Sequence, residues 1–174
     1  MHLIPEISVI FPIYNERDNL EPLLRELSLA LRTLDRRYEL IAVDDGSRDG
    51  SGLLLKKLRA TYPELKIITF RRNFGQSAAM DAGFRAAEGA VIVTLDSDLQ
   101  NDPADIPKMI TLLESGGYDL VSGWRKHRQD GLFFRRFPSL LANWMIRKVT
   151  GTRIHDMGCT LKVYRRAITD ELRL

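Results

Sequence analysis

Short runs of β-branched and other apolar residues alternate in this chain with longer segments whose apolar residues recur at helical spacing. Strands are predicted at residues 7–11, 40–43, 66–70, 90–95 and 120–122. The first predicted helix follows Asp18 and Asn19 and places these residues on one face: Leu20, Leu23, Leu24, Leu27 and Leu31. The second follows Ser47 and Asp49 and places these on one face: Leu53, Leu54, Leu55 and Leu58. With helices also predicted at 75–87 and 103–114, the alternation favours an α/β fold, a mostly parallel sheet with helices on both faces.

Polar residues follow each of the first four predicted strands. The clusters are 12–16 (PIYNE), 44–47 (DDGS), 71–75 (RRNFG) and 96–100 (DSDLQ). Ligands of such sheets bind beyond the carboxyl ends of the strands, so we expect the clusters to converge on one edge. The chain contains neither the G-x-x-x-x-G-K-[ST] phosphate loop nor the G-x-G-x-x-G fingerprint, which argues against a P-loop kinase and a Rossmann dehydrogenase.

Charge is distributed unevenly along the chain. Of its 174 residues, 44% are apolar, which is enough to build a core for one domain. Residues 1–123 hold 14 basic and 19 acidic residues, a net charge of −5, whereas residues 124–174 hold 12 and 4, a net charge of +8. The single cysteine, Cys159, excludes an internal disulfide and fits a reducing compartment. Neither a signal peptide nor a membrane-spanning apolar run is predicted.

Two carboxylates, Asp96 and Asp98, flank Ser97 where a predicted buried strand ends. Paired carboxylates repel one another unless a cation joins them. Their oxygen atoms suit Mg²⁺ or Mn²⁺, which bind one or two protein carboxylates and take water and substrate phosphate in the other positions. Gln100 can add a carbonyl oxygen. The alternative is that the aspartates cap the helix predicted next, a role for which Asp102 is equally suited.

A second acidic pair, Asp44 and Asp45, precedes Gly46, whose backbone freedom permits a tight turn. A carboxylate at this position can accept hydrogen bonds from a base N–H or from ribose hydroxyls, or it can form an Asx-turn and cap the next helix. Two arginines, Arg71 and Arg72, end the third predicted strand, where they either neutralise phosphate or form a solvated edge. The acidic pairs and the arginines together are typical of a site that binds a phosphate-bearing ligand with a metal ion.

The motifs occur in an order that resembles a known family. The stretches PIYNE, VDDGS, RRNFGQSAAMDAGF, LDSDLQNDP and DMGCTLKVYRR resemble the cytosolic catalytic domain of the polyprenyl-phosphate glycosyltransferases. This inverting family has the Rossmann-like GT-A fold and includes dolichyl-phosphate mannosyltransferase and bacterial undecaprenyl-phosphate sugar transferases. The resemblance covers nearly the whole chain. It implies a UDP- or GDP-linked sugar as donor, Mg²⁺ or Mn²⁺ as cofactor, and a polyprenyl phosphate as acceptor.

The resemblance also assigns roles to single positions. The residues that match the nucleotide pocket of the family are Pro12, Tyr14, Glu16, Val43 and Asp45, and those that match its D-x-D motif are Asp96, Ser97 and Asp98. In that motif the second aspartate binds metal together with the residue that matches Gln100. We expect Asp44 and Arg72 to join the nucleotide site, and Asp96 to join the metal site. Tyr14 could instead be a packing aromatic.

The acceptor side of the site is predicted in the basic part of the chain. Arg125 and Arg135, with Ser139, match residues that hold the acceptor phosphate in the mannosyltransferase branch. The catalytic residues are therefore expected to be Asp96, Asp98, Arg125 and Arg135. In this hypothesis a phosphate oxygen of the lipid, already an anion, attacks the anomeric carbon of the donor sugar with inversion and needs little help from a general base.

Residues 124–153 interleave basic side chains with aromatic and aliphatic ones. We expect residues 132–148 to lie on the cytoplasmic face of a membrane, with cations near anionic headgroups. The alternative is an amphipathic helix that packs on the sheet. Nucleic acid binding is not favoured, because the remainder of the chain is acidic. Residues 1–123 would then bind nucleotide sugar and metal, and residues 124–174 would face acceptor and membrane within the same domain.

The chain is expected to be part of a longer protein. Residues 170–174 are predicted to open a helix that has no cap, and the bacterial members of the family continue with membrane helices. The stretches RNFGQ and RQDGLFFRR are closer to the bacterial branch, which favours UDP-sugars. The sequence indicates neither the sugar nor the oligomeric state.

Two other functions stay open at this point, and a third is excluded by the order of the motifs. Transfer to a saccharide hydroxyl would need a carboxylate base; Asp156 is the one obvious candidate, and the Q-x-x-R-W signature of polysaccharide synthases is absent. A phosphoacceptor receiver domain would need its acidic pair after the first strand and a lysine after the last, whereas here Asp44 and Asp45 follow the second and Trp124 and Arg125 follow the fifth. A nucleotide-sugar binding module without activity also stays open.

Overall fold

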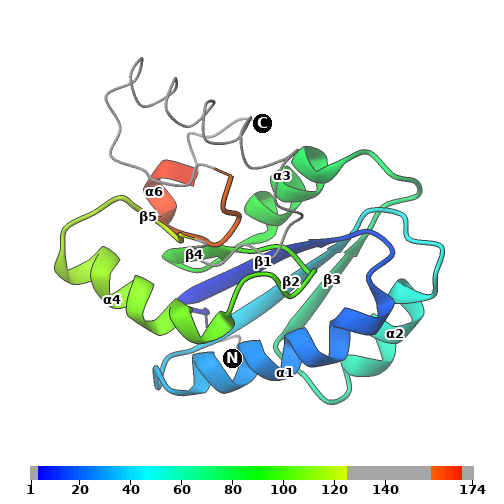
Figure 1. The fold of residues 1–174 in the computed structure, drawn as a ribbon, viewed down its shortest axis with the longest axis horizontal. Coiled ribbons are helices and arrows are strands. Elements are labelled where there is room, and N and C mark those ends of the chain that lie inside the picture. The colour runs from blue at the N-terminus through cyan, green and yellow to red at the C-terminus, as the bar shows by residue number, and fades with distance from the viewer. Residues whose placement is uncertain (1–3, 125–157, 170–174) are drawn as a thin grey trace, which may run out of the picture.

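The computed structural model describes residues 4–124 and 158–169. These residues form a six-stranded sheet with the strand order β3-β2-β1-β4-β6-β5 (Figure 1). The strands are β1 (Ile7–Ile13), β2 (Tyr38–Asp44), β3 (Leu65–Thr69), β4 (Val91–Thr94), β5 (Leu120–Ser122) and β6 (Lys162–Arg165). β1 runs parallel to β2 and β4, and β2 runs parallel to β3. The prediction of a mostly parallel sheet is confirmed.

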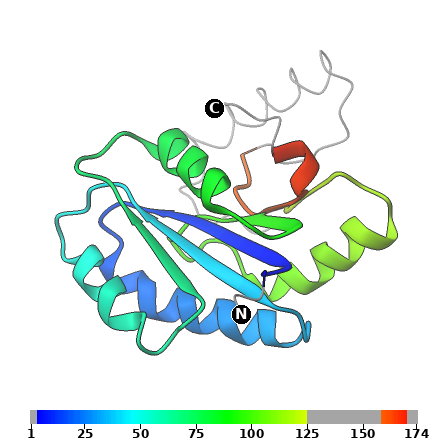
Figure 2. The same ribbon diagram turned by 180° about the vertical axis from the view of Figure 1, so that it is seen from behind.

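Helices cover both faces of the sheet, as predicted. One face carries α1 (Leu20–Arg32), α2 (Ser51–Leu58) and α4 (Ile106–Ser115), and the opposite face carries α3 (Gln76–Ala86). Figures 1 and 2 show this arrangement from opposite sides. Two 3₁₀ turns, η1 (Arg17–Asn19) and η2 (Pro103–Asp105), lead into α1 and α4, and a short helix, α6 (Arg166–Thr169), follows β6. Among the described residues, no helix is of a length and apolarity that could span a bilayer.

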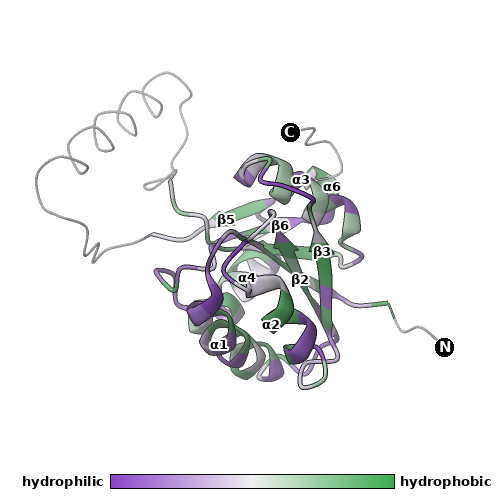
Figure 3. Ribbon diagram, turned by 90° about the vertical axis from the view of Figure 1, so that its right-hand side faces the viewer, coloured by the Kyte–Doolittle hydropathy of each residue, from purple (hydrophilic) through white to green (hydrophobic). Residues whose placement is uncertain are grey.

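Each face of the sheet has its own hydrophobic core. β1 shows the alternation: Val9 and Phe11 pack toward α1, α2 and α4, whereas Ile10 between them packs toward α3. Because both faces are covered, the parallel strands are largely apolar and do not show a strict alternation of apolar and polar residues. In Figure 3 hydrophobic residues dominate the strands, whereas the helices carry hydrophilic residues as well.

The leucine patterns predict α1 better than α2. The five leucines predicted on one face of α1 are all fully buried. In α2, Leu55 and Leu58 are buried, but Leu53 is 68% exposed, so its predicted place on the buried face was wrong. Consecutive helical positions are rotated by about 100°, and the turn that points Leu55 and Leu58 inward therefore points Leu53 to solvent.

β6 has no counterpart among the predicted strands. It lies between β4 and β5 and is antiparallel to both. Its four residues contain a single fully buried apolar side chain, Val163, so local periodicity gave no signal. The strand is stabilised by pairing with β4, from which it is distant in sequence.

A buried carboxylate lies near the amino ends of the strands. Glu39 of β2 is only 3% exposed, and its Oε1 accepts hydrogen bonds from Ser8 Oγ at 2.5 Å and from the backbone N–H of Glu88 at 2.8 Å. Lys66 Nζ lies 2.7 Å from its other oxygen. Ser8 Oγ also accepts from the backbone N–H of Gly89 at 2.8 Å. Neighbouring segments β1, β2, β3 and the approach to β4 are thereby joined at this edge.

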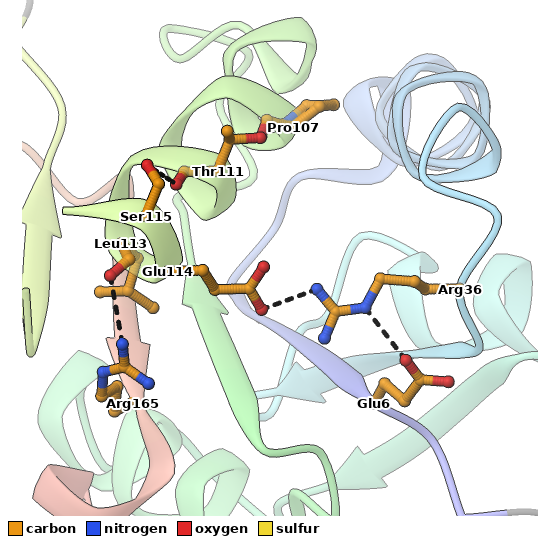
Figure 4. Close-up of polar contacts among 8 residues, drawn as sticks. All are labelled: Glu6, Arg36, Pro107, Thr111, Leu113, Glu114, Ser115 and Arg165. Carbon is orange, nitrogen blue, oxygen red and sulfur yellow. Dashed lines mark hydrogen bonds and ion pairs between the residues drawn. The ribbon is translucent and has the colours of Figure 1, made fainter. Parts of the chain in front are cut away.

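Arg36, in the turn between α1 and β2, braces the same end of the molecule (Figure 4). Its Nε donates to Glu6 at 3.0 Å and its Nη1 to Glu114 of α4 at 2.8 Å. Partial burial alone would lower the pKa of Arg36, but the bonds to Glu114 and Glu6 raise it above its ordinary value. In the same view Arg165 of β6 donates to the carbonyl of Leu113 at 3.3 Å.

We predict that Arg36→Ala lowers the free energy of unfolding by about 1 kcal/mol, because two partly exposed ion pairs are lost. Urea denaturation followed by circular dichroism measures the change. The control is Arg25→Ala, which removes an exposed arginine of α1. Equal stability losses in the two variants would contradict the bracing role of Arg36.

Candidate active site

A cavity of about 470 Å³ lies at the carboxyl ends of β1, β2 and β4, beside the start of α3. Its lining consists of Pro12, Ile13, Tyr14, Glu16, Asp45, Asn73, Gly75, Gln76, Asp96, Ser97 and Asp98. All four polar clusters contribute to this lining. The parallel register causes the convergence, because it places the ends of neighbouring strands side by side.

The loop after β1 is held against the loop after β2. Asn15 adopts a left-handed φ of 59°, its backbone N–H donates to Ser47 Oγ at 3.0 Å, and its Oδ1 accepts from the backbone N–H of Arg48 at 2.8 Å. Asparagine tolerates this conformation better than most residues. The constrained turn places its two neighbours, Tyr14 and Glu16, in the cavity lining.

Asp45 connects the end of β2 to the start of α3. The residue is 3% exposed, and its Oδ1 and Oδ2 accept from the backbone N–H groups of Phe74 at 2.7 Å and Gly75 at 2.9 Å. A carboxylate offers about four lone-pair sites, so two remain for a ligand. Asp45 can therefore organise the loop of residues 71–75 and also accept hydrogen bonds from a ligand in the cavity.

Asp44 has a different environment from Asp45. Its Oδ1 accepts from the backbone N–H of Ser47 at 2.9 Å, which is the Asx-turn considered in the sequence analysis. α2 packs directly on its carboxylate, since a Cβ added to Gly52 would lie 2.6 Å from Asp44 Oδ2. Consecutive residues of a strand end point to opposite sides. Asp44 therefore supports the turn and does not line the cavity.

Gly46 allows the loops after β2 and β3 to touch. Its φ is +73°, and an added Cβ would meet the carbonyl carbon of Arg72 and lie 2.8 Å from the backbone nitrogen of Asn73. No side chain fits between these backbones. Asn73 is in this way brought to the cavity lining.

The D-x-D segment presents two carboxylates to the cavity. Asp96 Oδ1 accepts from Gln76 Nε2 of α3 at 2.7 Å, and Asp98 Oδ1 accepts from the backbone N–H of Gln100 at 3.1 Å. The capping role belongs to Asp102, whose Oδ1 accepts from the backbone N–H of Ala104 at 2.9 Å at the start of η2. The capping alternative thus holds for Asp102 and not for the cavity pair.

Some predicted site residues lie elsewhere. Val43 is fully buried in the core beneath α3. Arg72 is exposed, and its guanidinium carbon lies 4.8 Å from the ring centre of Phe74. Gln100 is exposed beside the cavity lining. The positions Arg125, Arg135, Ser139 and Asp156, and the segment 132–148, are outside the described residues.

Several residues of the lining were not predicted as site residues from the sequence. They are Ile13, Asn73, Gly75 and Gln76. Asn73 and Gly75 belong to a polar cluster that was recognised, whereas Gln76 stands at the first position of α3. A polar residue that opens a helix directly after a strand-end cluster is the signal that could have identified Gln76.

The cavity suits a small hard cation. The described residues hold no cluster of three or more His, Cys, Asp and Glu side chains arranged as metal ligands. They do place two carboxylates, Asp96 and Asp98, on one cavity. Mg²⁺ and Mn²⁺ bind to one or two protein carboxylates and complete their coordination with water and substrate phosphate, so the donor set fits such an ion.

Residues 8–173 match the family model for glycosyl transferase family 2. The chain belongs to this family. As a family 2 glycosyltransferase it is not a phosphoacceptor receiver domain, in agreement with the order of its motifs. Its order of motifs and its sheet agree with the family resemblance found in the sequence.

Curated relatives of this glycosyltransferase 2 chain act on polyprenyl phosphates according to their names. A dodecaprenyl-phosphate galacturonate synthase from Rhizobium johnstonii is 46% identical over 97% of this chain and 50% of the relative. An undecaprenyl-phosphate 4-deoxy-4-formamido-L-arabinose transferase from Pseudomonas syringae is 45% identical over 95% of this chain and 49% of the relative. The chain thus spans about half the length of the curated relatives it matches.

Solved structures confirm the GT-A fold of the chain. A mannosyltransferase from Pyrobaculum calidifontis in complex with GDP-Man and Mn²⁺ superposes with a TM-score of 0.71 at 22% identity, over 98% of this chain and 47% of that one. A glucosyl-3-phosphoglycerate synthase from Mycobacterium tuberculosis, in complex with Mn²⁺, UDP and phosphoglyceric acid, gives 0.70 at 20% identity, over 94% and 57%.

Asp49 provides a pH-dependent link beside the cavity. Its Oδ1 accepts from Ser51 Oγ at 2.6 Å and from the Ser51 backbone N–H at 3.0 Å, and its Oδ2 accepts from the backbone N–H of Arg17 at 3.0 Å. Burial alone would raise the pKa of Asp49, but these hydrogen bonds lower it below the ordinary value of 3.8. The link ties the loop after β1 to the start of α2.

We predict that Asp49→Asn reduces the acid sensitivity of the fold. A lowered pKa contributes stability above the unfolded-state value of 3.8, and this contribution is lost as the pH falls through the folded-state pKa. The variant should therefore lose less unfolding free energy than the wild type between weakly acidic solution and pH values below 3.8. Urea denaturation across this range measures it, with Asp18→Asn in η1 as control. The same pH slope in wild type and Asp49→Asn would contradict the prediction.

The close approach of Gly46 to the backbone of Arg72 and Asn73 is tested by comparing Gly46→Ala with Gly117→Ala. Both glycines have positive φ, but an added Cβ at Gly117 meets nothing within 4 Å. Gly117→Ala should cost about 1 kcal/mol of unfolding free energy, the usual penalty of the left-handed conformation. Gly46→Ala should cost ~2 kcal/mol more, because it also drives two backbones apart. Equal losses of unfolding free energy in the two variants, measured by chemical denaturation, would show that the loops after β2 and β3 can separate without cost.

Proposed function

We propose that this chain is the catalytic part of a metal-dependent inverting glycosyltransferase that transfers a sugar from a nucleotide-diphosphate sugar to a polyprenyl phosphate. The observation that carries the proposal is the cavity where Asp45, Asp96 and Asp98 meet at the carboxyl ends of the strands. The chain's membership of glycosyl transferase family 2 and the names of its relatives support the reaction class.

The donor is proposed to lie along the cavity from β1 and β2 to β4. Pro12 and Tyr14 would flank the base, and Glu16 and Asp45 would accept hydrogen bonds from the nucleoside. Tyr14 is 48% exposed, so its ring can bury apolar area against a ligand. The hydroxyl of Ser97 donates a hydrogen bond to the backbone carbonyl of Pro12 at 2.9 Å. This bond fixes the side chain and supports a positioning role for Ser97 beside the diphosphate.

Asp98 is proposed to hold Mg²⁺ or Mn²⁺ with Gln100, and Asp96 to contribute from the other side of Ser97. Bound there, the cation would stabilise the negative charge of the departing nucleoside diphosphate. Asp96 is itself oriented by Gln76, whose amide nitrogen lies 2.7 Å from its Oδ1. Two structural neighbours in complex with Mn²⁺, one with GDP-Man and one with UDP, support a divalent ion in this fold.

The chemistry requires positioning more than proton transfer. A lipid phosphate oxygen forms a bond to the anomeric carbon while the bond from that carbon to the diphosphate oxygen breaks, and the configuration inverts. The nucleophile is already anionic, so the protein's task is to hold two anionic substrates together. We propose that Arg125, Arg135 and Ser139 bind the acceptor phosphate through charge-assisted hydrogen bonds.

A membrane location follows from the proposed acceptor. Undecaprenyl and dodecaprenyl chains reside in bilayers, so the acceptor phosphate would be offered at a membrane surface. We propose that the segment 132–148 contacts the cytoplasmic face of that membrane, since it combines basic and aromatic residues. Vesicles with anionic headgroups are the appropriate acceptor carrier for assays.

The proposal predicts that Asp98→Asn lowers sugar transfer by about a hundredfold or more, because stabilisation of the leaving diphosphate is lost. Release of nucleoside diphosphate and the lipid product are measured with UDP- and GDP-sugars, Mn²⁺ and undecaprenyl phosphate in vesicles. Asp105→Asn in η2, an exposed carboxylate outside the cavity lining, is the control and should keep wild-type activity.

Removing the metal with a chelator should abolish transfer, and added Mn²⁺ should restore it. Full metal-dependent transfer by Asp98→Asn would overturn the assignment of the metal site. Transfer to an oligosaccharide but not to the lipid phosphate would favour the saccharide hydroxyl as acceptor. Nucleotide binding without release of diphosphate would indicate a binding module.

A further inference from the structure

Two buried polar side chains anchor the segment that carries the paired aspartates. We call residues 96–101 the D-x-D loop. Ser97 and Asn101 are 4% and 6% exposed, whereas Leu99 and Gln100 between them are exposed. Ser97 fastens the beginning of the loop to β1 through the carbonyl of Pro12. Asn101 occupies the corresponding place at the other end, and neither the motif nor the cavity lining assigns it a role.

Asn101 binds to a segment that is distant in sequence. Its Nδ2 donates to Thr160 Oγ1 at 3.0 Å, and its Oδ1 accepts from Cys159 Sγ at 3.5 Å. The side chain thus uses both its donor and its acceptor on two consecutive residues, in a buried setting where unmade hydrogen bonds are costly. This contact joins the D-x-D loop to the segment 159–161, which leads into β6.

The partner segment is itself firmly held. Thr94 Oγ1, at the end of β4, donates to the carbonyl of Thr160 at 2.8 Å. The backbone N–H of Gly123, just after β5, donates to the carbonyl of Leu161 at 2.8 Å. Residues 159–161 are therefore attached to the ends of β4 and β5. Asn101 is thus bound to a segment that is itself hydrogen-bonded to two strands of the sheet.

The backbone between the two anchors is strained. Leu99 has a φ of 61°, in the left-handed region that residues other than glycine, asparagine and aspartate seldom adopt. Such a conformation persists only where surrounding contacts impose it. Asp98 and Gln100 flank Leu99 directly, so their placement depends on that conformation. Release of one anchor would let Leu99 relax and would displace both neighbours.

We infer that Asn101 is a positioning residue that holds the D-x-D loop in the conformation required to bind the divalent cation. The inference rests on the proposed function, because the cation belongs to it. Asn101 acts through Thr160 and Cys159 on the loop backbone and does not touch the ion. Through Asn101, the residues that shape the site include the segment before β6, although no residue of that segment lines the cavity.

The test measures Mn²⁺ binding in the presence of UDP or GDP, by the loss of the free-ion electron paramagnetic resonance signal. Asn101→Leu keeps the size of the side chain and removes both hydrogen bonds. Contacts that support metal ligands typically change metal affinity by about 10- to 100-fold when they are removed, so we expect at least tenfold weaker binding. Thr160→Val, which retains the backbone carbonyl that binds Thr94, should weaken Mn²⁺ binding in the same direction.

The double variant identifies the shared contact. If Asn101 and Thr160 act through one hydrogen bond, Asn101→Leu with Thr160→Val should bind Mn²⁺ no more weakly than Asn101→Leu alone. Ser8→Ala is the matched control, since it removes a buried hydroxyl with two hydrogen bonds near the amino ends of the strands, away from the cavity. It should lower the melting temperature and leave Mn²⁺ affinity unchanged.

Unchanged Mn²⁺ affinity in Asn101→Leu and Thr160→Val, with melting temperatures lowered as in Ser8→Ala, would overturn the inference and leave Asn101 a purely structural residue. If Asn101→Leu does not fold, Thr160→Val decides by itself. A wild type that binds Mn²⁺ with nucleotide but transfers no sugar would refute the proposed function. The Mn²⁺ affinities of Asn101→Leu and Thr160→Val would still decide the inference. A wild type that binds no Mn²⁺ with either nucleotide would overturn the inference.

Discussion

The two hydrogen bonds that the Asp45 carboxylate accepts from the amides of Phe74 and Gly75 determine the shape of the candidate site. Bonds from N–H groups to an ionised carboxylate are stronger than neutral ones, and a negative charge at this position also favours the start of α3. Once α3 begins there, Gln76 stands opposite Asp96 and the cavity has its second wall. The D-x-D loop is thus presented to a surface that β2 and α3 have already organised.

The parts of the fold that follow from local pattern were predictable, and the parts that follow from distant pairing were not. The leucine spacing of α1 and the apolar runs of β1, β2, β3, β4 and β5 are local signals in the sequence, whereas β6 is four residues long and forms against β4. In the candidate site, Asp45, Asp96 and Asp98 were predictable because they follow strands. Sequence alone did not show that Asp44 turns away from the cavity, nor that Gln76 and Asn101 contact the D-x-D loop. Those facts depend on the direction of a side chain in the assembled fold.

The two ends of the strands are held together by different contacts. At the amino ends, Glu39 and Arg36 join neighbouring segments through hydrogen bonds and ion pairs. At the carboxyl ends, Asn15 and Leu99 hold unusual backbone conformations, which cost free energy and persist only within a rigid surrounding. Positive φ also occurs at Asp35 near the amino ends, so the carboxyl ends differ in that Asn15 and Leu99 stand next to residues of the cavity lining.

The position of β6 between β4 and β5 means that order along the chain differs from order in the sheet. During synthesis on the ribosome, β1, β2, β3 and β4 can pair as soon as they emerge, but β5 has no neighbour in the sheet until residues 162–165 have been made. The open edge of β4 would meanwhile be exposed to other nascent chains, a situation that favours assistance by chaperones. The pairing of β6 with β4 also brings Thr160 to the D-x-D loop.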